Sequence, residues 1–421
     1  KMIQINANKI IENISFLSVG QVIKVLVRLL AFSIITRSLT IDQYGQVLTV
    51  IAFCELFQIF TLPGINKNLE RAACRDLNNI DQILSSKSGI RNYAAIIAIS
   101  LVNIIVTFLS YDEIVINLIR FYSLVLLVDS LKEYTRIIFK AFEDFKWISF
   151  SEVFQSISYL ALVLISISYQ FGIEGIVAAS ILSTIFGFLF DFINSKKYSR
   201  FKLFGGASID KVFLISASVF TLTNIMWLII TKIDIFMLSI LGSSEEVVIY
   251  GVANRIIFFG LIATSLISNV IYPPLVKRIK EYGNLQITKK HLRLLFYSCL
   301  AIVCGCAIAA ILSDSIITLI AGDKYLKSAE IFNILLLFLI FQALAVPIKL
   351  IMYAADKEKL FLLIVMPLPF IKIILNYFGF KFLGINGLAF STVIVYLSYL
   401  IVMVLLNKDL LKSTLSMELN R

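Results

Sequence analysis

Apolar segments long enough to cross a bilayer follow one another along almost the whole of this chain. Of its 421 residues, 59% are hydrophobic and only 15% are charged, with a mean hydropathy of +0.92. A helix needs about 20 apolar residues to span the hydrocarbon core. We therefore expect an all-α polytopic membrane protein. Twelve spans are predicted, at about residues 15–38, 44–65, 92–109, 114–139, 147–169, 175–193, 212–241, 248–272, 294–312, 328–353, 360–380 and 387–406.

The loops between the predicted spans alternate in charge. One set is rich in lysine and arginine, as in residues 67–91, 194–211 and 277–293. The opposite set is short and mainly acidic, with Asp42 and Asp112 as examples. Because lysine and arginine are enriched in cytoplasmic loops, both termini are predicted to lie in the cytoplasm. The formal net charge of +11 follows from these loops and gives no reason to expect a nucleic-acid partner.

The chain also repeats itself. The stretch DQYGQV at 42–47 corresponds to VVIYGV at 247–252, and FGIEGIVAAS at 171–180 corresponds to LGINGLAFST at 383–392. Each half then holds six spans, and an even number gives both halves the same orientation in the membrane.

The repeat predicts two pseudo-symmetric six-helix lobes around a central cavity. We expect an N-terminal lobe at residues 1–193, a cytoplasmic linker at 194–211 and a C-terminal lobe at 212–421. Two parallel bundles with a site between them are typical of transporters.

The first predicted span carries two cations in its middle, Lys24 and Arg28. Their spacing of four residues puts both on one helix face. A cation at the bilayer centre costs roughly 3 kcal/mol, so we expect both to face water or an anion. Other basic residues inside spans are candidates for the same role: Lys232, Arg255 and Lys349. Three more could instead extend to the membrane interface: Arg37, Arg120 and Lys372.

Acids inside the spans are candidates for ion coupling or gating, since a carboxyl that exchanges H⁺ or Na⁺ changes the charge within the membrane. The candidates are Glu55, Asp129, Glu133 and Asp234. Asp234 aligns with Arg28 in the repeat, and an Arg28–Asp234 ion pair that forms in one transport state and breaks in the other is a hypothesis. Asp129 and Glu133 share a span with Lys132 and Arg136, so an alternative is that these acids and bases only neutralise one another. Glu152 and Asp191 are further interior acids, and a structural role is open for every acid named here.

The loop 66–91 has an amphipathic pattern, with Leu69, Ala73 and Leu77 at helical spacing and basic residues on the other faces. This pattern predicts a helix on the anionic surface of the membrane. A solvated helix that touches no lipid is the alternative.

The sequence contains no phosphate-binding glycine loop, no metal-ligand cluster and no nucleophile motif. The five cysteines lie in spans or in a predicted cytoplasmic loop, and the single histidine, His291, lies in another such loop. We therefore expect a protein that is not an enzyme and that uses no cofactor. Any energy for transport must then come from an ion gradient, the membrane potential or the substrate's own gradient.

The N-terminal run NKIIENISFLSVGQVIKVLVRLLAFSIITRSLTIDQYGQVLTVIAF resembles the opening of the Wzx-type polysaccharide flippases. These carry O-antigen or capsule repeat units and belong to the multidrug/oligosaccharidyl-lipid/polysaccharide exporter superfamily. Arg37, Leu39 and Tyr44-Gly45 occupy the family's Arg-x-Leu…Tyr-Gly turn, and residues 268–281 and 321–329 are also similar to that family.

The resemblance implies movement of an undecaprenyl-diphosphate-linked oligosaccharide from the cytoplasmic to the outer leaflet of a bacterial inner membrane. The five basic candidates above would then contact the diphosphate or sugar. Counter-transport of H⁺ or Na⁺, or the membrane potential, would drive export. Membrane lipids and other polysaccharide-assembly proteins are the expected partners.

Other functions remain open. Multidrug exporters of the same superfamily carry cations, and the surplus of intramembrane lysine and arginine argues against that class. Lipid II flippases usually have two further C-terminal helices. A membrane-embedded polymerase usually needs a large outer loop, and the longest one predicted here is 313–327. A passive scaffold in a polysaccharide-assembly complex would tolerate neutral replacement of Arg28 and Arg255.

Overall fold

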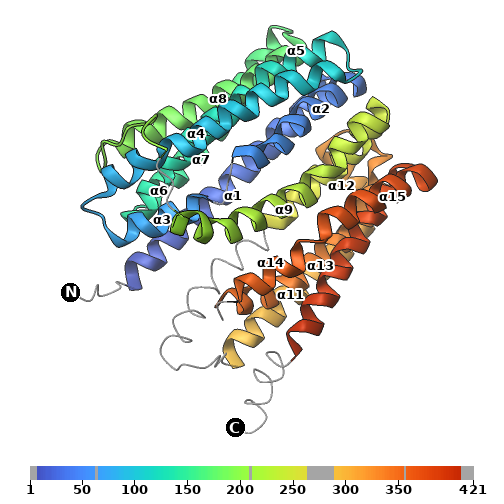
Figure 1. Cartoon of the computed structure of the whole chain (residues 1–421). Coiled ribbons are helices and arrows are strands. Elements are labelled where there is room, and N and C mark those ends of the chain that lie inside the picture. The colour runs from blue at the N-terminus through green and yellow to red at the C-terminus, as the bar shows by residue number, and fades with distance from the viewer. Residues whose placement is uncertain (1–6, 62–64, 208–210, 263–288, 355–356, 409–421) are drawn as a thin grey trace. The chain divides into compact units, whose positions relative to one another are not determined.

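The computed structural model describes residues 7–61, 65–207, 211–262, 289–354 and 357–408. Within these ranges all regular structure is helical, as expected (Figure 1). The motif at 268–281 and the first part of the basic loop 277–293 lie outside the described residues, as does the end of the predicted span 248–272.

The first part of the chain folds into a series of helices joined by short turns. Thr40 starts the second of them with a capping box, in which its hydroxyl accepts from the Gln43 backbone N–H and its own N–H donates to the Gln43 side chain. The helices are α1 (Ala7–Ser38), α2 (Ile41–Phe57), α3 (Ile65–Arg75), α4 (Ile80–Ile105), α5 (Glu113–Tyr122), α6 (Leu124–Ala141), α7 (Lys146–Ser168), α8 (Gly172–Ser195) and α9 (Lys211–Leu241).

The second part begins with residues 244–262, which are helical. It continues with α11 (Lys289–Ile311), α12 (Ser313–Ile320), α13 (Ser328–Ala354), α14 (Glu358–Val365) and α15 (Leu368–Leu406). Helix α15 covers part of the predicted span 360–380 and all of 387–406, and its backbone leaves the helical region between them at Gly384, where φ is +59°. Glycine adopts this left-handed conformation at no steric cost.

Nine helices in the described part of the chain are long and apolar enough to cross a membrane. The number rises to ten if α11 and α12, which are bent by 79° at their junction, form one span. The predicted spans 360–380 and 387–406 both fall within Glu358–Leu406, which counts as one of the nine, although its backbone leaves the helical region at Gly384 between them. The chain is therefore a multi-pass membrane protein, and most of the predicted spans have a helical counterpart.

The chain divides into two compact units, residues 1–248 and 249–421. In the first unit α7 packs against α1 and α8, and α6 packs against α4 and α8. In the second, α13 packs against α11 and α15. Helix α9 belongs to the first unit because it packs on α2 and α3. The predicted lobes, residues 1–193 and 212–421 with a linker at 194–211, were inferred from the sequence repeat. They stay a prediction about internal symmetry.

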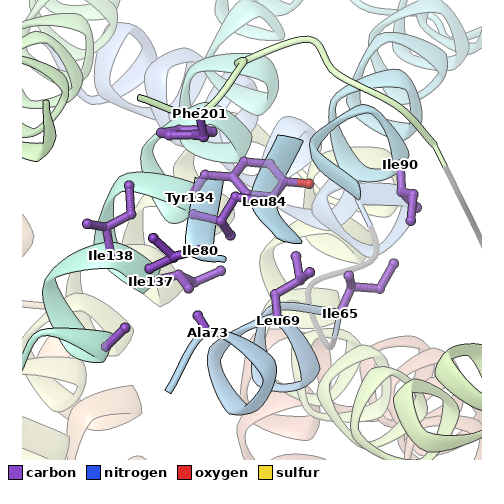
Figure 2. Packing of buried hydrophobic residues seen from close by; sticks show 11 residues of the cluster. Ile65, Leu69, Ala73, Ile80, Leu84, Ile90, Tyr134, Ile137, Ile138 and Phe201 are labelled. Carbon is purple, nitrogen blue, oxygen red and sulfur yellow. The ribbon is translucent and has the colours of Figure 1, made fainter. Parts of the chain in front are cut away.

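Helix α3 is amphipathic as predicted, but its apolar face meets protein instead of lipid or water. Leu69 and Ala73 have no exposed surface and pack in a cluster with Ile137 and Ile138 of α6 and Leu84 of α4 (Figure 2). Both expectations for this helix are therefore wrong at its apolar face, because α6 covers it together with the part of α4 that precedes the predicted span 92–109.

The linker after α8 also packs on protein. We call residues 196–207 the linker strap; it lies along the first turns of α4. The Gly206 N–H donates to the Ser85 carbonyl over 2.8 Å, and the Gly206 carbonyl accepts from the Gly89 N–H over 3.0 Å. Ser88 Oγ donates to the Lys202 carbonyl, and Phe201 joins the cluster of Figure 2. The predicted loop thus fixes the end of α8 to α4.

Candidate functional site

The first unit contains a cavity of about 350 Å³ whose lining is strongly charged. Four of its charged residues come from α6, two from α1 and one each from α2, α4 and α7. The basic ones are Lys24, Arg28, Arg91, Lys132 and Arg136, and the acidic ones are Glu55, Asp129, Glu133 and Glu152. The lining thus carries five basic and four acidic side chains, a small positive excess.

Helix α1 supplies the two cations that the sequence singled out. Lys24 and Arg28 are one turn apart, and both line the cavity. Lys24 Nζ lies 3.3 Å from Glu152 Oε2 on α7, the helix against which α1 packs. The cations therefore face a polar cavity, as expected, and one of them already has an acidic partner there.

Helix α6 carries charges along one face, as its helical spacing dictates. Arg136 is central, because Nη1 lies 3.5 Å from Glu133 Oε1 and Nη2 lies 3.1 Å from Glu152 Oε1. Neutralisation within the helix, one of the two interpretations of this span, is therefore only part of the arrangement. Arg136 also joins α6 to α7, and Glu133 accepts a hydrogen bond from Asn66 Nδ2 over 3.0 Å.

Lys132 on the same helix lies at the inner wall of the cavity and is only 4% exposed. Its Nζ donates to Gln155 Oε1 over 2.5 Å and lies 4.0 Å from the carboxylate of Asp191, which is fully buried. Gly187 of α8 makes room for this ammonium, since a Cβ there would lie 2.7 Å from Nζ. Gln155 Nε2 in turn donates to Thr184 Oγ1. A polar chain thus leads from the cavity toward α8.

Glu55 and Lys232 were predicted for different roles but lie together. Lys232 Nζ on α9 donates to Glu55 Oε2 on α2 over 2.7 Å. Glu55 lines the cavity. Lys232 is therefore connected to the cavity by its ion pair with Glu55.

The remaining sequence candidates lie elsewhere. Asp234 on α9 is 4% exposed and is not among the cavity-lining residues. Arg255 and Lys349 belong to the second unit. The Lys349 ammonium lies 5.8 Å from the ring centre of Tyr353 and 5.6 Å from that of Phe361, in cation–π contacts. Asp129 and Glu133, by contrast, line the cavity with the α1 cations.

Sequence reasoning missed Arg91, which it placed in a loop. Helix α4 begins at Ile80, so Arg91 lies within the helix, is 6% exposed and donates through Nε to the Thr61 carbonyl over 3.0 Å. Glu152 and Arg136 were noted as interior charges without a site. Arg136 and Glu152 are 16 positions apart, on either side of the turn that joins α6 to α7. That short separation was the signal that could have paired them.

The described residues contain no group of three or more histidine, cysteine or carboxylate side chains close enough to hold a metal ion. The cavity offers a set of guanidinium and ammonium donors, and those of Lys24, Lys132 and Arg136 lie within 4.0 Å of a carboxylate. Such donors bind phosphate or carboxylate groups through charge-assisted hydrogen bonds.

Comparison with known proteins identifies the fold. A family model described as polysaccharide biosynthesis protein matches residues 10–278. The structure is similar to the lipid II flippase MurJ in an inward closed conformation, with 17% identity and a TM-score of 0.72 over 94% of this chain and 89% of that one. No curated protein matches the chain.

Two further solved structures share the fold. One is a MOP superfamily transporter from Pyrococcus furiosus whose binding pocket is described as having reverse polarity, with 16% identity and a TM-score of 0.66 over 96% of each chain. The other is a mutant of the Vibrio cholerae MATE transporter VcmN, with 15% identity and a TM-score of 0.60 over 97% of each chain. The fold is that of the MOP superfamily, as predicted.

Proposed function

We propose a transport function for this chain, which belongs to the family of polysaccharide biosynthesis proteins. It is a flippase, not an enzyme, for an undecaprenyl-diphosphate-linked oligosaccharide repeat unit of the O-antigen or capsule type. It moves this lipid from the cytoplasmic to the outer leaflet of a bacterial inner membrane by alternating access, with both termini in the cytoplasm. Its partners are the lipid-linked substrate, membrane lipids and other polysaccharide-assembly proteins.

The observation that carries this proposal is the convergence of basic side chains from α1, α4 and α6 in one cavity. The lipid-linked sugar has an anionic, hydrated headgroup and a tail that can stay in the bilayer. Guanidinium groups bind two phosphate oxygens at once, and ammonium groups add a compact charge. Lys24 and Arg28 are the first contacts that we assign to the diphosphate, and Lys232, Arg255 and Lys349 are further candidates.

The membrane potential favours this direction of movement. Each elementary charge that crosses is worth about 2.3 kcal/mol per 100 mV, and the diphosphate carries about two negative charges outward. Counter-transport of H⁺ or Na⁺ then resets the carrier, with Glu55, Asp129, Glu133 and Asp234 as the candidate acids.

A second candidate function is export of a cationic drug. The observation that favours it is the set of four acids among the cavity-lining residues, which leaves only a small positive excess. Lipid II export is an alternative for the same anionic chemistry.

The test is reconstitution in liposomes that contain a fluorescent lipid-linked oligosaccharide. The appearance of the sugar on the far leaflet is followed with and without a proton gradient, a Na⁺ gradient or a potential. We expect movement by the wild type and at least a tenfold slower rate in the double variant Lys24→Met/Arg28→Met. Arg37→Met is the matched control, since Arg37 lies on the same helix but does not line the cavity.

The same vesicles separate the candidates. Lipid II in place of the oligosaccharide tests that headgroup, and a cationic dye such as ethidium tests the drug exporter. Transport of the dye alone would overturn the flippase proposal, and absence of any lipid movement by the folded wild type would also do so.

A further inference from the structure

We propose that Glu152 is an internal counter-anion that competes with the substrate's phosphate for Lys24 and Arg136 and so sets how tightly the headgroup is held. The proposal rests on the flippase function proposed above. It assigns to Glu152 the role of a specificity and release residue, acting through the two cations that it holds.

The geometry of the Glu152 carboxylate is that of a bridge. Oε2 lies 3.3 Å from Lys24 Nζ on α1, and Oε1 lies 3.1 Å from Arg136 Nη2 on α6. Two oxygens on one acid thus engage two cations on two other helices. A phosphate would engage the same pair in the same way, with one oxygen to each donor. Glu152 therefore occupies the position that a bound phosphate would take between these side chains.

The exposed fractions of these three side chains allow an incoming anion to replace Glu152 at the two cations. The side chains of Lys24 and Arg136 are 30% and 21% exposed, whereas that of Glu152 is 14% exposed. Lys24, Arg136 and Glu152 all line the cavity, so an incoming anion reaches the cations without unfolding the site. The carboxylate lies deeper than either partner.

Other acids of the cavity are engaged differently. Glu55 accepts from Lys232, and Glu133 is shared between Arg136 of its own helix and Asn66. In the described part of the chain, Glu152 is the cavity acid with a distance below 4 Å to basic side chains of two other helices. Neutralising Glu152 therefore frees two donors at once, while neutralising Glu133 adds the same charge but leaves the Lys24–Glu152 contact in place.

The functional consequence is weaker binding and faster release. A carrier must bind its cargo well enough to admit it and loosely enough to let it leave. Because the substrate has to displace Glu152, part of its interaction with Lys24 and Arg136 is offset by the lost internal pairs. When the headgroup departs, the carboxylate returns and prevents immediate rebinding.

The test compares Glu152→Gln with Glu133→Gln and the wild type in the flippase assay, with inorganic pyrophosphate as a competitor. We expect Glu152→Gln to lower KM and the inhibitory concentration of pyrophosphate by about tenfold, the size of one charge-assisted contact. The maximal rate should also fall, because release slows. Glu174→Gln, a change of an exposed acid in the first turn of α8, serves as the control for unspecific effects.

The outcomes separate this proposal from the flippase function. If the wild type moves no lipid, the flippase function fails. If the wild type is active but Glu152→Gln leaves KM unchanged or raises it, only the role of Glu152 fails. An equal fall in KM in Glu133→Gln would also overturn it, since net charge would then suffice.

A more conservative variant covers the case in which Glu152→Gln does not fold. Glu152→Asp keeps the charge but draws the carboxylate back from both cations. A fall in KM smaller than about tenfold supports the competition, and an unchanged KM contradicts it.

Discussion

Lys232 Nζ on α9 lies 2.7 Å from Glu55 Oε2 on α2, across 177 positions of sequence. Their side chains are 30% and 29% exposed, so the pair is partly shielded from solvent. It joins α9 to α2, which pack against each other in the first unit. A cation predicted to bind substrate and an acid predicted to couple an ion thus neutralise one another.

We expect Lys232→Met and Glu55→Gln each to lower the free energy of unfolding by about 1 kcal/mol, because each removes this ion pair. The double variant should lose less than the sum, and the swapped pair Lys232→Glu/Glu55→Lys should recover part of the loss. Thermal unfolding in detergent measures all four variants. Strictly additive losses would mean that the two residues do not interact in solution.

The sequence predicted the fold, and it singled out two of the basic side chains that line the cavity of the first unit, for physical reasons. Long apolar segments have to form helices in lipid, where every backbone group needs an internal partner. Lys24 and Arg28 were found because two cations one turn apart in an apolar span have to face something polar. That energetic cost predicts a polar environment, and the structure supplies it as the cavity that both residues line.

The rest of the cavity depends on pairs that no local pattern contains. The contacts of Lys24 with Glu152 and of Lys232 with Glu55 join residues 128 and 177 positions apart. Arg91 escaped notice because a charge lowers the hydropathy of its surroundings, so the predicted span began after it, while the helix begins at Ile80. Hydropathy locates the lipid-facing part of a helix and misses its protein-covered extension.

Leu69→Ala should destabilise the protein strongly, although Leu69 lies in a loop by sequence. The side chain has no exposed surface and packs in the cluster of Figure 2, so truncation leaves a cavity and should cost about 2–5 kcal/mol. Leu77→Ala is the control, because Leu77 is 39% exposed and lies between α3 and α4. Chemical denaturation of the two variants measures the difference. Similar small losses in both would indicate that α3 lies on the membrane surface and not on α6.

The alkylation of Cys74, at the end of α3, by iodoacetamide should have its midpoint at a higher pH than that of an ordinary cysteine. Cys74 is exposed as a residue, but partial desolvation by its surroundings, and then the negative charge of Glu70, raise the pKa of its thiol above that of an ordinary cysteine. Only the thiolate is nucleophilic, so a raised pKa moves the midpoint of the alkylation rate to higher pH. The profile is measured in Cys304→Ala, which lacks the other exposed cysteine.

Glu70→Gln in that background should move the Cys74 midpoint back toward lower pH, because it removes a negative charge that disfavours the thiolate. Unfolding the protein in detergent should also move the Cys74 midpoint toward lower pH. A midpoint equal to that of the unfolded protein would contradict the raised pKa of this thiol.

Gly205→Ala should detach the linker strap from α4. A Cβ at residue 205 would lie 1.9 Å from the Ser85 carbonyl oxygen and 2.7 Å from Ser88 Oγ, so the strap has to move. That movement would break the hydrogen bond of 2.8 Å from the Gly205 N–H to Ser88 Oγ. We expect a loss of about 1–3 kcal/mol, as for other overpacked sites. The local readout is trypsin cleavage after Arg200 or Lys202, two exposed residues of the strap, which should become several-fold faster.

Gly305→Ala is the matched control for this change. A Cβ at Gly305, in α11, meets nothing within 4 Å. In a helix interior the exchange of glycine for alanine is favourable by up to about 1 kcal/mol, so the stability should stay the same or rise. Cleavage of the strap should then be as slow as in the wild type. If Gly205→Ala leaves that cleavage equally slow, the strap is held by its side chains, through Phe201 and Ser199, and not by the close approach of its glycines to α4.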